Sequence, residues 1–249
     1  MKVCELNNEL LKVYGDWLNE LRQINDGKFL SDSYSNPYFI AAPESWLNSK
    51  LKVMVVGKEG AGGGCGKGEW CKNPQQDMRK IIEYTTTYPQ IQEKIITENF
   101  CGSTVNNSAF WRRFRNVYDM VGSPVIWNNF DKIHYMPQKG EKRSKCTLDN
   151  AERKLLHSTT TKILRKEIEI LKPTHVIFFG WYKKFLVSEL PELKENGLAI
   201  EEHKGQCFCD GVTYIISNHP TWGMFHPDYE NSVLNLISES FKAEINKNF

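Results

Sequence analysis

The sequence lacks any long apolar run. No stretch approaches the roughly 20 consecutive apolar residues that a membrane-spanning helix needs. The opening segment, MKVCELNNELLKVYGDW, carries acidic and amide side chains where a secretory signal would be apolar. We therefore expect a cytoplasmic protein without a membrane partner.

A strong net charge is also missing, because 32 Lys and Arg residues nearly balance 30 Asp and Glu residues. A nucleic acid would therefore have to be bound by a local basic patch. The composition is 40% apolar and 25% charged, as in an ordinary folded protein, which excludes disordered and collagen-like chains.

The seven cysteines do not have the spacing of a structural zinc site. Five residues separate Cys65 from Cys71, and one separates Cys207 from Cys209. Paired zinc ligands are typically separated by about two to four residues. We expect reduced thiols, no metal site and no cofactor.

Short apolar runs alternate with segments of helical periodicity. The runs are typical of buried parallel strands and lie at 51–57, 124–129, 174–180 and 211–217. Helices are predicted at 4–24, 75–99, 108–121, 149–171, 181–188 and 229–246. This alternation predicts an α/β fold. We expect a monomer with a single domain over residues 1–249, on which residues 1–45 pack as an N-terminal helical extension.

Polar side chains follow several of the predicted strands. The carboxyl ends of the strands are where open α/β sheets bind their ligands. A carboxylate, two amides and a histidine are expected there, at Glu59, Asn128, Asn129 and His219.

The loop after the first strand, GKEGAGGGCGKGEW, is rich in glycine but matches no nucleotide-binding template. Ala61 stands where a Walker loop needs its first glycine, and Gly68 stands where that loop needs Ser or Thr. A flexible loop over a site is therefore favoured over a phosphate cradle.

Three strand ends occur in a characteristic order: VVGKE, WNNF and ISNHPTW. In this order they resemble the uracil-DNA glycosylase superfamily, over roughly residues 50–245. The resemblance implies a three-layer α/β/α sandwich with a central, mostly parallel four-stranded sheet. It also implies DNA as the partner and hydrolysis of the N-glycosidic bond of uracil or another altered base, as in DNA repair by base flipping.

The resemblance also implies roles for individual residues. Glu59 corresponds to the residue that positions the hydrolytic water, and His219 to the histidine that stabilises the departing base. The base would be bound by Gly57, Lys58, Asn129 and Phe110, with Asn129 at its Watson–Crick edge and Phe110 as an aromatic floor. Lys58 and Gly60 replace the usual Gln or Glu and the usual Pro, and Thr221 and Trp222 depart from the His-Pro-Ser-Pro pattern.

DNA contacts are expected at two segments. The basic run that follows Asn129 provides Lys142, Arg143 and Lys145 for phosphate contacts. Beside His219, the candidates are Pro220, Thr221 and Trp222, and apolar side chains there could enter a base stack.

Simpler interpretations stay open for each site residue. Glu59 could be a solvated loop acid, Asn129 a turn former and His219 a core or turn histidine. Phe110 could be an ordinary packing residue. The arginines at 112, 113 and 115 suit a solvated helix face as well as a DNA contact. Two other functions stay open: a non-catalytic reader of a base, nucleotide or DNA, and an enzyme acting on a free nucleoside.

Overall fold

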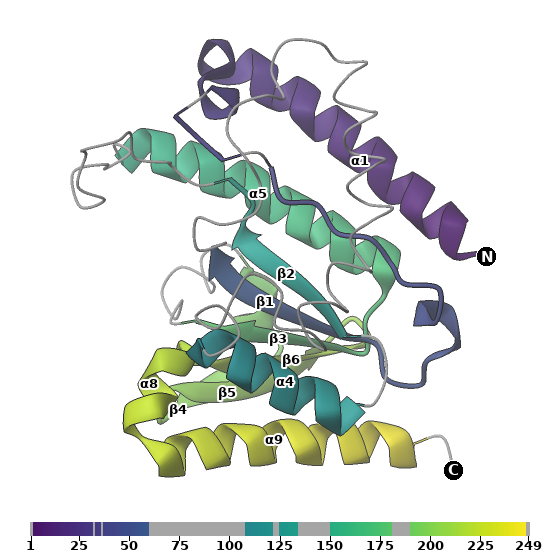
Figure 1. The fold of residues 1–249 in the computed structure, drawn as a ribbon, viewed down its shortest axis with the longest axis vertical. Coiled ribbons are helices and arrows are strands. Elements are labelled where there is room, and N and C mark those ends of the chain that lie inside the picture. Colours follow the sequence, from purple (N-terminus) through teal and green to yellow (C-terminus); the bar gives the residue numbers. More distant parts are fainter. Residues whose placement is uncertain are drawn as a thin grey trace. The chain divides into compact units, whose positions relative to one another are not determined.

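The computed structural model describes residues 2–31, 33–35, 37–59, 108–121, 125–133, 150–180 and 190–247 (Figure 1). It divides into two compact units. The helical unit contains the described residues of 2–41, Lys58, Glu59, 129–133 and 150–171. The sheet unit contains the described residues of 42–57, 108–128 and 172–247. The expectation of a single domain over residues 1–249 with an extension at 1–45 stays a prediction.

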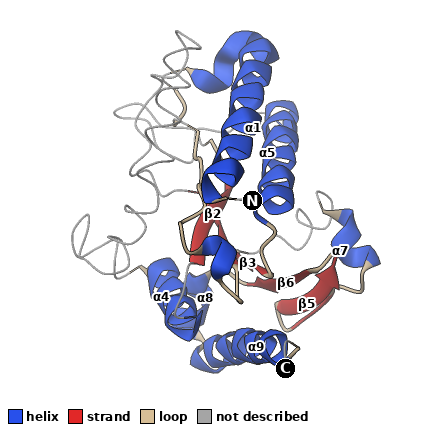
Figure 2. Ribbon diagram, turned by 90° about the vertical axis from the view of Figure 1, so that its right-hand side faces the viewer, coloured by secondary structure: helices blue, strands red, loops and turns tan. Residues whose placement is uncertain are grey.

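The helical unit contains two long helices, α1 (Val3–Gln23) and α5 (Asn150–Leu171), and the 3-10 helix η1 (Ile24–Leu30). Leu6, Leu10, Trp17 and Leu21, which are four or seven positions apart, lie on the buried face of α1. Helices α1 and α5 lie side by side (Figures 1 and 2).

A buried polar network joins the elements of this unit. The Lys132 ammonium donates to Glu167 Oε1 at 2.7 Å, and both side chains are fully buried. The Tyr14 hydroxyl donates to the same oxygen at 2.8 Å and accepts the Ile40 N–H at 3.2 Å. Burial lowers the pKa of Lys132, and Glu167 opposes this shift. The network links α1 and residue 40 to α5.

The sheet contains six strands in the order β2-β1-β3-β6-β5-β4. Their bounds are Val53–Glu59 (β1), Val125–Asp131 (β2), His175–Phe179 (β3), Ala199–Glu201 (β4), Lys204–Cys209 (β5) and Val212–Ser217 (β6). Strands β1, β3 and β6 are parallel, whereas β5 and β4 extend the sheet in antiparallel pairs. The sheet is therefore mixed.

All four predicted strands are present, as β1, β2, β3 and β6, but the sheet contains six strands, so a four-stranded sheet is not confirmed. Strands β4 and β5 were missed because exposed residues alternate with buried residues in β5, so β5 is not a continuous apolar run, and because β4 is only three residues long. Strand β2 also continues to Asp131, so Asn129 lies within the strand instead of at its end.

The helices of the sheet unit are η2 (Trp46–Asn48), α4 (Ala109–Val121), α7 (Pro191–Glu195), α8 (Pro220–Phe225) and α9 (Pro227–Asn246). Helices α4, α8 and α9 lie on one face of the sheet (Figure 2). Their core side chains, such as Phe114 and Ile237, pack with those of the strands, such as Ile177 and Ile215.

The structure confirms the helices predicted at 4–24, 108–121, 149–171 and 229–246. Those predicted at 75–99 and 181–188 lie outside the described residues. Among the described helices, none is both long enough and apolar enough to span a membrane.

His175, at the start of β3, is fully buried beneath α9 side chains. Its Nδ1 lies 2.9 Å from Thr174 Oγ1 and its Nε2 lies 3.0 Å from Ser240 Oγ. Burial lowers the pKa of His175 from 6.5 to about 4, against the opposing effect of Glu244. The folded protein therefore holds this imidazole neutral.

We expect His175 to make stability depend on pH. Its folded pKa lies below its unfolded pKa, so the unfolded chain binds more protons as the pH falls from 6.5 to 4. The contribution of His175 to the free energy of unfolding is complete above pH 6.5, and about 3 kcal/mol of it is lost by pH 4. Urea unfolding of the protein and of His175→Gln across this range measures it. Equal pH slopes for the two proteins would contradict this role.

Candidate functional site

The carboxyl ends of the parallel strands β1, β3 and β6 meet at one edge of the sheet. Gly57 lies in β1 near this edge, Gly180 follows β3, and Asn218 and His219 follow β6. The Gly180 N–H donates to the Ser217 carbonyl at 3.1 Å, which joins the ends of β3 and β6. Ligands of open α/β sheets bind at such an edge.

Arg113 of α4 is a buried cation at the end of β6. Its Nε and Nη2 donate to the two carboxylate oxygens of Glu230 on α9. Its Nη1 donates to Ser217 Oγ at 3.0 Å and to the Asn218 carbonyl at 2.8 Å. The guanidinium carbon also lies 5.2 Å from the centroid of the Phe179 ring. This one side chain therefore binds α4, β6 and α9 together.

Gly223 of α8 lies directly against this ion pair. A Cβ at this position would overlap Glu230 Oε2 and lie 2.9 Å from Arg113 Nη2. A larger residue here would have to displace the Glu230 carboxylate, which Arg113 holds by two hydrogen bonds.

His219 is the exposed N-cap of α8, and its Nδ1 accepts the Thr221 N–H at 3.2 Å. A ring nitrogen that accepts a hydrogen bond carries no proton, so the neutral imidazole has its proton on Nε2. The local fold thus selects the tautomer in which Nε2 is a donor.

Tyr229 of α9 holds the residue that precedes His219. Its hydroxyl accepts the Asn218 N–H at 2.7 Å and donates to the His203 carbonyl at 2.9 Å. Burial raises the pKa of Tyr229, although the Asn218 N–H opposes the shift, so the phenol keeps the proton that it donates. The hydroxyl therefore ties the β4–β5 turn to the end of β6.

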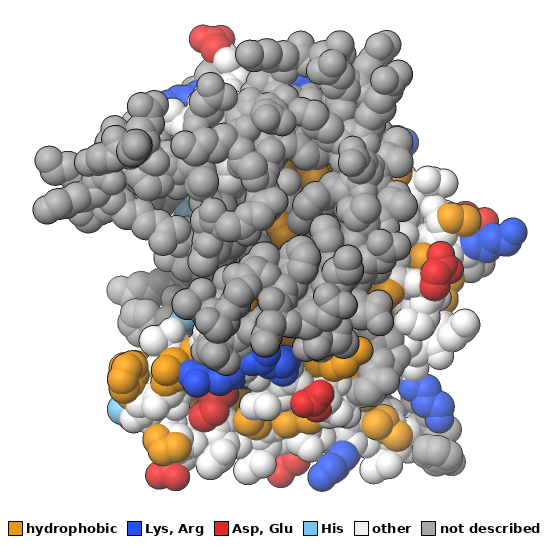
Figure 3. Space-filling view, viewed as in Figure 1, with side chains coloured by type: hydrophobic (Ala, Val, Ile, Leu, Met, Phe, Trp, Pro, Cys, Tyr) orange, Lys and Arg blue, Asp and Glu red, His pale blue; other side chains and the backbone are white. Residues whose placement is uncertain are grey.

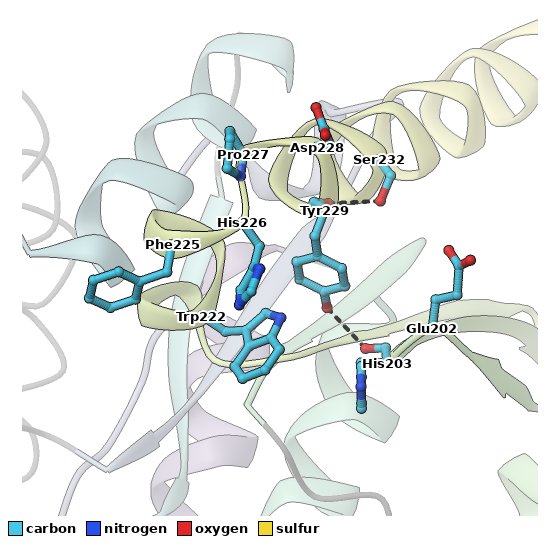
Figure 4. A pocket seen from close by; sticks show the side chains of 9 residues that line it. All are labelled: Glu202, His203, Trp222, Phe225, His226, Pro227, Asp228, Tyr229 and Ser232. Carbon is cyan, nitrogen blue, oxygen red and sulfur yellow. Dashed lines mark hydrogen bonds between the residues drawn. The ribbon is translucent and has the colours of Figure 1, made fainter.

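A pocket of about 560 Å³ lies beside α8 (Figure 4). It is lined by Glu202, His203, Trp222, Phe225, His226, Pro227, Asp228, Tyr229 and Ser232. The Trp222 ring has two imidazoles close to it: it stacks on His226 with centroids 4.3 Å apart, and the tilted His203 ring has its centroid 5.9 Å away. The pocket therefore combines aromatic rings with carboxylates.

One wall of this pocket is a two-residue hairpin turn in an unusual conformation. Glu202 and His203 have φ angles of 45° and 66°. Such turns require positive φ at both positions and favour Asn-Gly. Glu and His are strained there, and residues held in strained conformations cluster at binding sites.

The structure places the other predicted base-binding residues as follows. Asn129 is buried in β2 and belongs to the helical unit. Phe110 is half-buried on α4, with its centroid 5.8 Å from that of Phe179 and 6.2 Å from that of Trp127. This setting is an aromatic part of the core of the sheet unit. Gly57 is buried in β1.

The remaining predicted residues are less fully described. Lys58 and Glu59 end β1, but their side chains lie outside the described part of the structure, as do Lys142, Arg143 and Lys145. On α8, Pro220 is buried, whereas Thr221 and Trp222 are exposed. No group of His, Cys, Asp or Glu side chains suited to holding a metal ion occurs among the described residues.

Tyr229 was not predicted as part of the site, and Arg113 was expected, with Arg112 and Arg115, to suit a solvated helix face as well as a DNA contact. A signal for Arg113 was present, because it lies four residues from both Ala109 and Val117 on the buried face of α4. No comparable sequence signal identifies the hydroxyl contacts of Tyr229.

No family model matches the chain, and no curated protein matches it either.

We expect Gly223→Ala to destabilise the protein by about 3 kcal/mol, because the methyl group would push Glu230 away from buried Arg113. Thr221→Ala, an exposed change on the same short helix, is the control and should alter stability by less than about 0.5 kcal/mol. Urea unfolding measures both. An unchanged stability of Gly223→Ala would show that Glu230 can make room for a methyl group without a loss of stability.

Proposed function

We propose that the protein binds DNA and hydrolyses the N-glycosidic bond of uracil or another altered base. The proposed fold is the three-layer α/β/α sandwich of the uracil-DNA glycosylase superfamily, with β2, β1, β3 and β6 as its central strands. The adjacent positions of these four strands support this assignment.

The observation that carries the proposal is the state of His219 at the carboxyl end of β6. In its neutral form the ring presents an Nε2–H donor, because Nδ1 accepts the Thr221 N–H. Cleavage of a glycosidic bond leaves negative charge on the departing base and positive charge on the sugar. A positioned donor to the base oxygen stabilises that charge as it develops.

Other residues complete the proposed reaction in the roles that the resemblance implies. Glu59 accepts a proton from the water that attacks the sugar C1′. The bond from C1′ to the base nitrogen breaks, the base leaves with the electron pair, and the proton that Glu59 accepted returns to the base through solvent. Asn129 reads the Watson–Crick edge of the base, since an amide donates and accepts at once. Lys142, Arg143 and Lys145 contact phosphates.

We expect His219→Asn to lose activity while the protein remains folded. Asn is a good N-cap residue, so it preserves the hydrogen bond to Thr221, but it lacks the Nε2 donor. The rate should fall about 100-fold or more, as for the loss of one transition-state donor. End-labelled oligonucleotides with a single uracil, hypoxanthine, xanthine or mismatched thymine, cleaved by alkali after reaction, give this rate. Glu59→Gln should lower it as well.

Three results of this assay are informative. Abasic sites from the unchanged protein, lost in both variants, would support the proposed roles and identify the target base. Binding of the oligonucleotide without base release would indicate a non-catalytic reader. If neither occurs, the proposal fails and free nucleosides become the substrates to test.

Asn129→Asp should change which base is released or abolish release, because it replaces an amide donor with a carboxylate acceptor. The same set of oligonucleotides provides the measurement, and thermal unfolding checks that the buried substitution leaves the protein folded. A folded variant with the original base preference would exclude Asn129 from base recognition.

A further inference from the structure

We infer that the pocket beside α8 binds an arginine side chain of a protein partner. This inference goes beyond the proposed glycosylase activity and does not depend on it. Its basis is the charge, the ring arrangement and the apolar surroundings of the pocket.

The charged side chains of the pocket favour a cation. Two carboxylates, Glu202 and Asp228, lie at its rim, and no Lys or Arg is among the described residues that line it. Lys204 pairs with Glu202 at 3.3 Å, but Glu202 stays largely exposed. Asp228 makes no hydrogen bond or ion pair with other described residues. Both carboxylates point outward from the rings (Figure 4), so a guanidinium would form paired hydrogen bonds with one of them at the rim of the pocket.

The rings of the pocket favour a planar cation. Trp222, His226 and Tyr229 come from the α8–α9 corner, and His203 from the β4–β5 turn (Figure 4). Arginine stacks on aromatic rings through its flat guanidinium, which ammonium groups cannot do equally well. His226 already stacks on Trp222, so the guanidinium would contact the part of the Trp222 ring that stays exposed. The Tyr229–His203 hydrogen bond fixes the two walls before a ligand arrives.

The surroundings favour a protein over a small cation. Trp222, Met224 and Phe225 of α8 are 45%, 53% and 74% exposed, and they are three of the five large apolar side chains exposed in the described part of the chain. Hydrophobic side chains gather over α8 on the molecular surface (Figure 3). A free cation would leave this apolar patch uncovered, whereas a partner chain would cover it.

The same features disfavour nucleic acid in this pocket. Glu202 and Asp228 would repel the phosphates of a strand whose bases stacked on Trp222. The sequence predicts that Trp222 contacts DNA, whereas the pocket predicts that Trp222 contacts an arginine side chain. The two predictions name different ligands for this side chain and can be tested against each other.

The test uses acetyl-Leu-Arg-Leu amide as the probe and the same peptide with citrulline, an uncharged isostere of arginine, as its control. NMR titration of the full-length protein follows the indole N–H signals, with Trp222→Phe to assign the signal of Trp222. We expect saturable shifts of that signal with the arginine peptide and at least tenfold weaker binding of the citrulline peptide.

Variants locate the site. The double variant Glu202→Gln and Asp228→Asn should weaken binding of the arginine peptide at least tenfold, and Trp222→Ala should abolish it. Glu201→Gln removes an exposed carboxylate next to the pocket, outside its lining, and should leave binding unchanged.

Several outcomes would overturn the inference. Equal binding of the two peptides, or no binding of either, would show that the pocket does not recognise arginine. Equal affinity for acetyl-arginine amide alone would point to a small cation as the ligand instead of a protein. Shifts of the Trp222 signal by a single-stranded oligonucleotide but by neither peptide would assign this surface to nucleic acid.

Discussion

The sheet unit depends on one buried guanidinium. Arg113 satisfies the Glu230 carboxylate, the Ser217 hydroxyl and the Asn218 carbonyl at once. A buried charge without these partners would be costly, so α4, β6 and α9 can pack only in the arrangement that supplies them. The site follows from this constraint, because His219 and α8 begin immediately after the residues that Arg113 holds.

The helical unit is organised by the same physical requirement. Lys132 and Glu167 are fully buried, and Tyr14 adds a third polar group to the pair. Hydrophobic packing alone would allow α1 to slide or rotate along α5, whereas a buried hydrogen-bonded pair accepts one alignment. Each unit therefore combines a broad apolar interface with one polar contact that fixes its register.

The elements that could be predicted from the sequence are those with a strong periodic signal. The buried strands β3 and β6 are continuous apolar runs, and α9 repeats its apolar residues at helical spacing. Strand β5 has neither property, because Lys204, Gly205 and Gln206 leave it without a continuous apolar run, and α8 is too short to show a period. His219 was identifiable because a strand signal precedes it. The role of Arg113 depends on a contact with a residue more than 100 positions away, and the role of Tyr229 on a contact with a residue more than 10 positions away.

The three-residue strand β4 has a consequence for self-association. An edge strand exposes backbone donors and acceptors that can pair with another molecule, and long flat edges promote aggregation. Here the edge offers only a few such groups, between exposed Glu201 and the tight turn at Glu202 and His203. The edge strand of a second molecule could form only a few hydrogen bonds with β4 before it reached the carboxylates of Glu201 and Glu202. This end of the sheet therefore resists growth into an open-ended assembly.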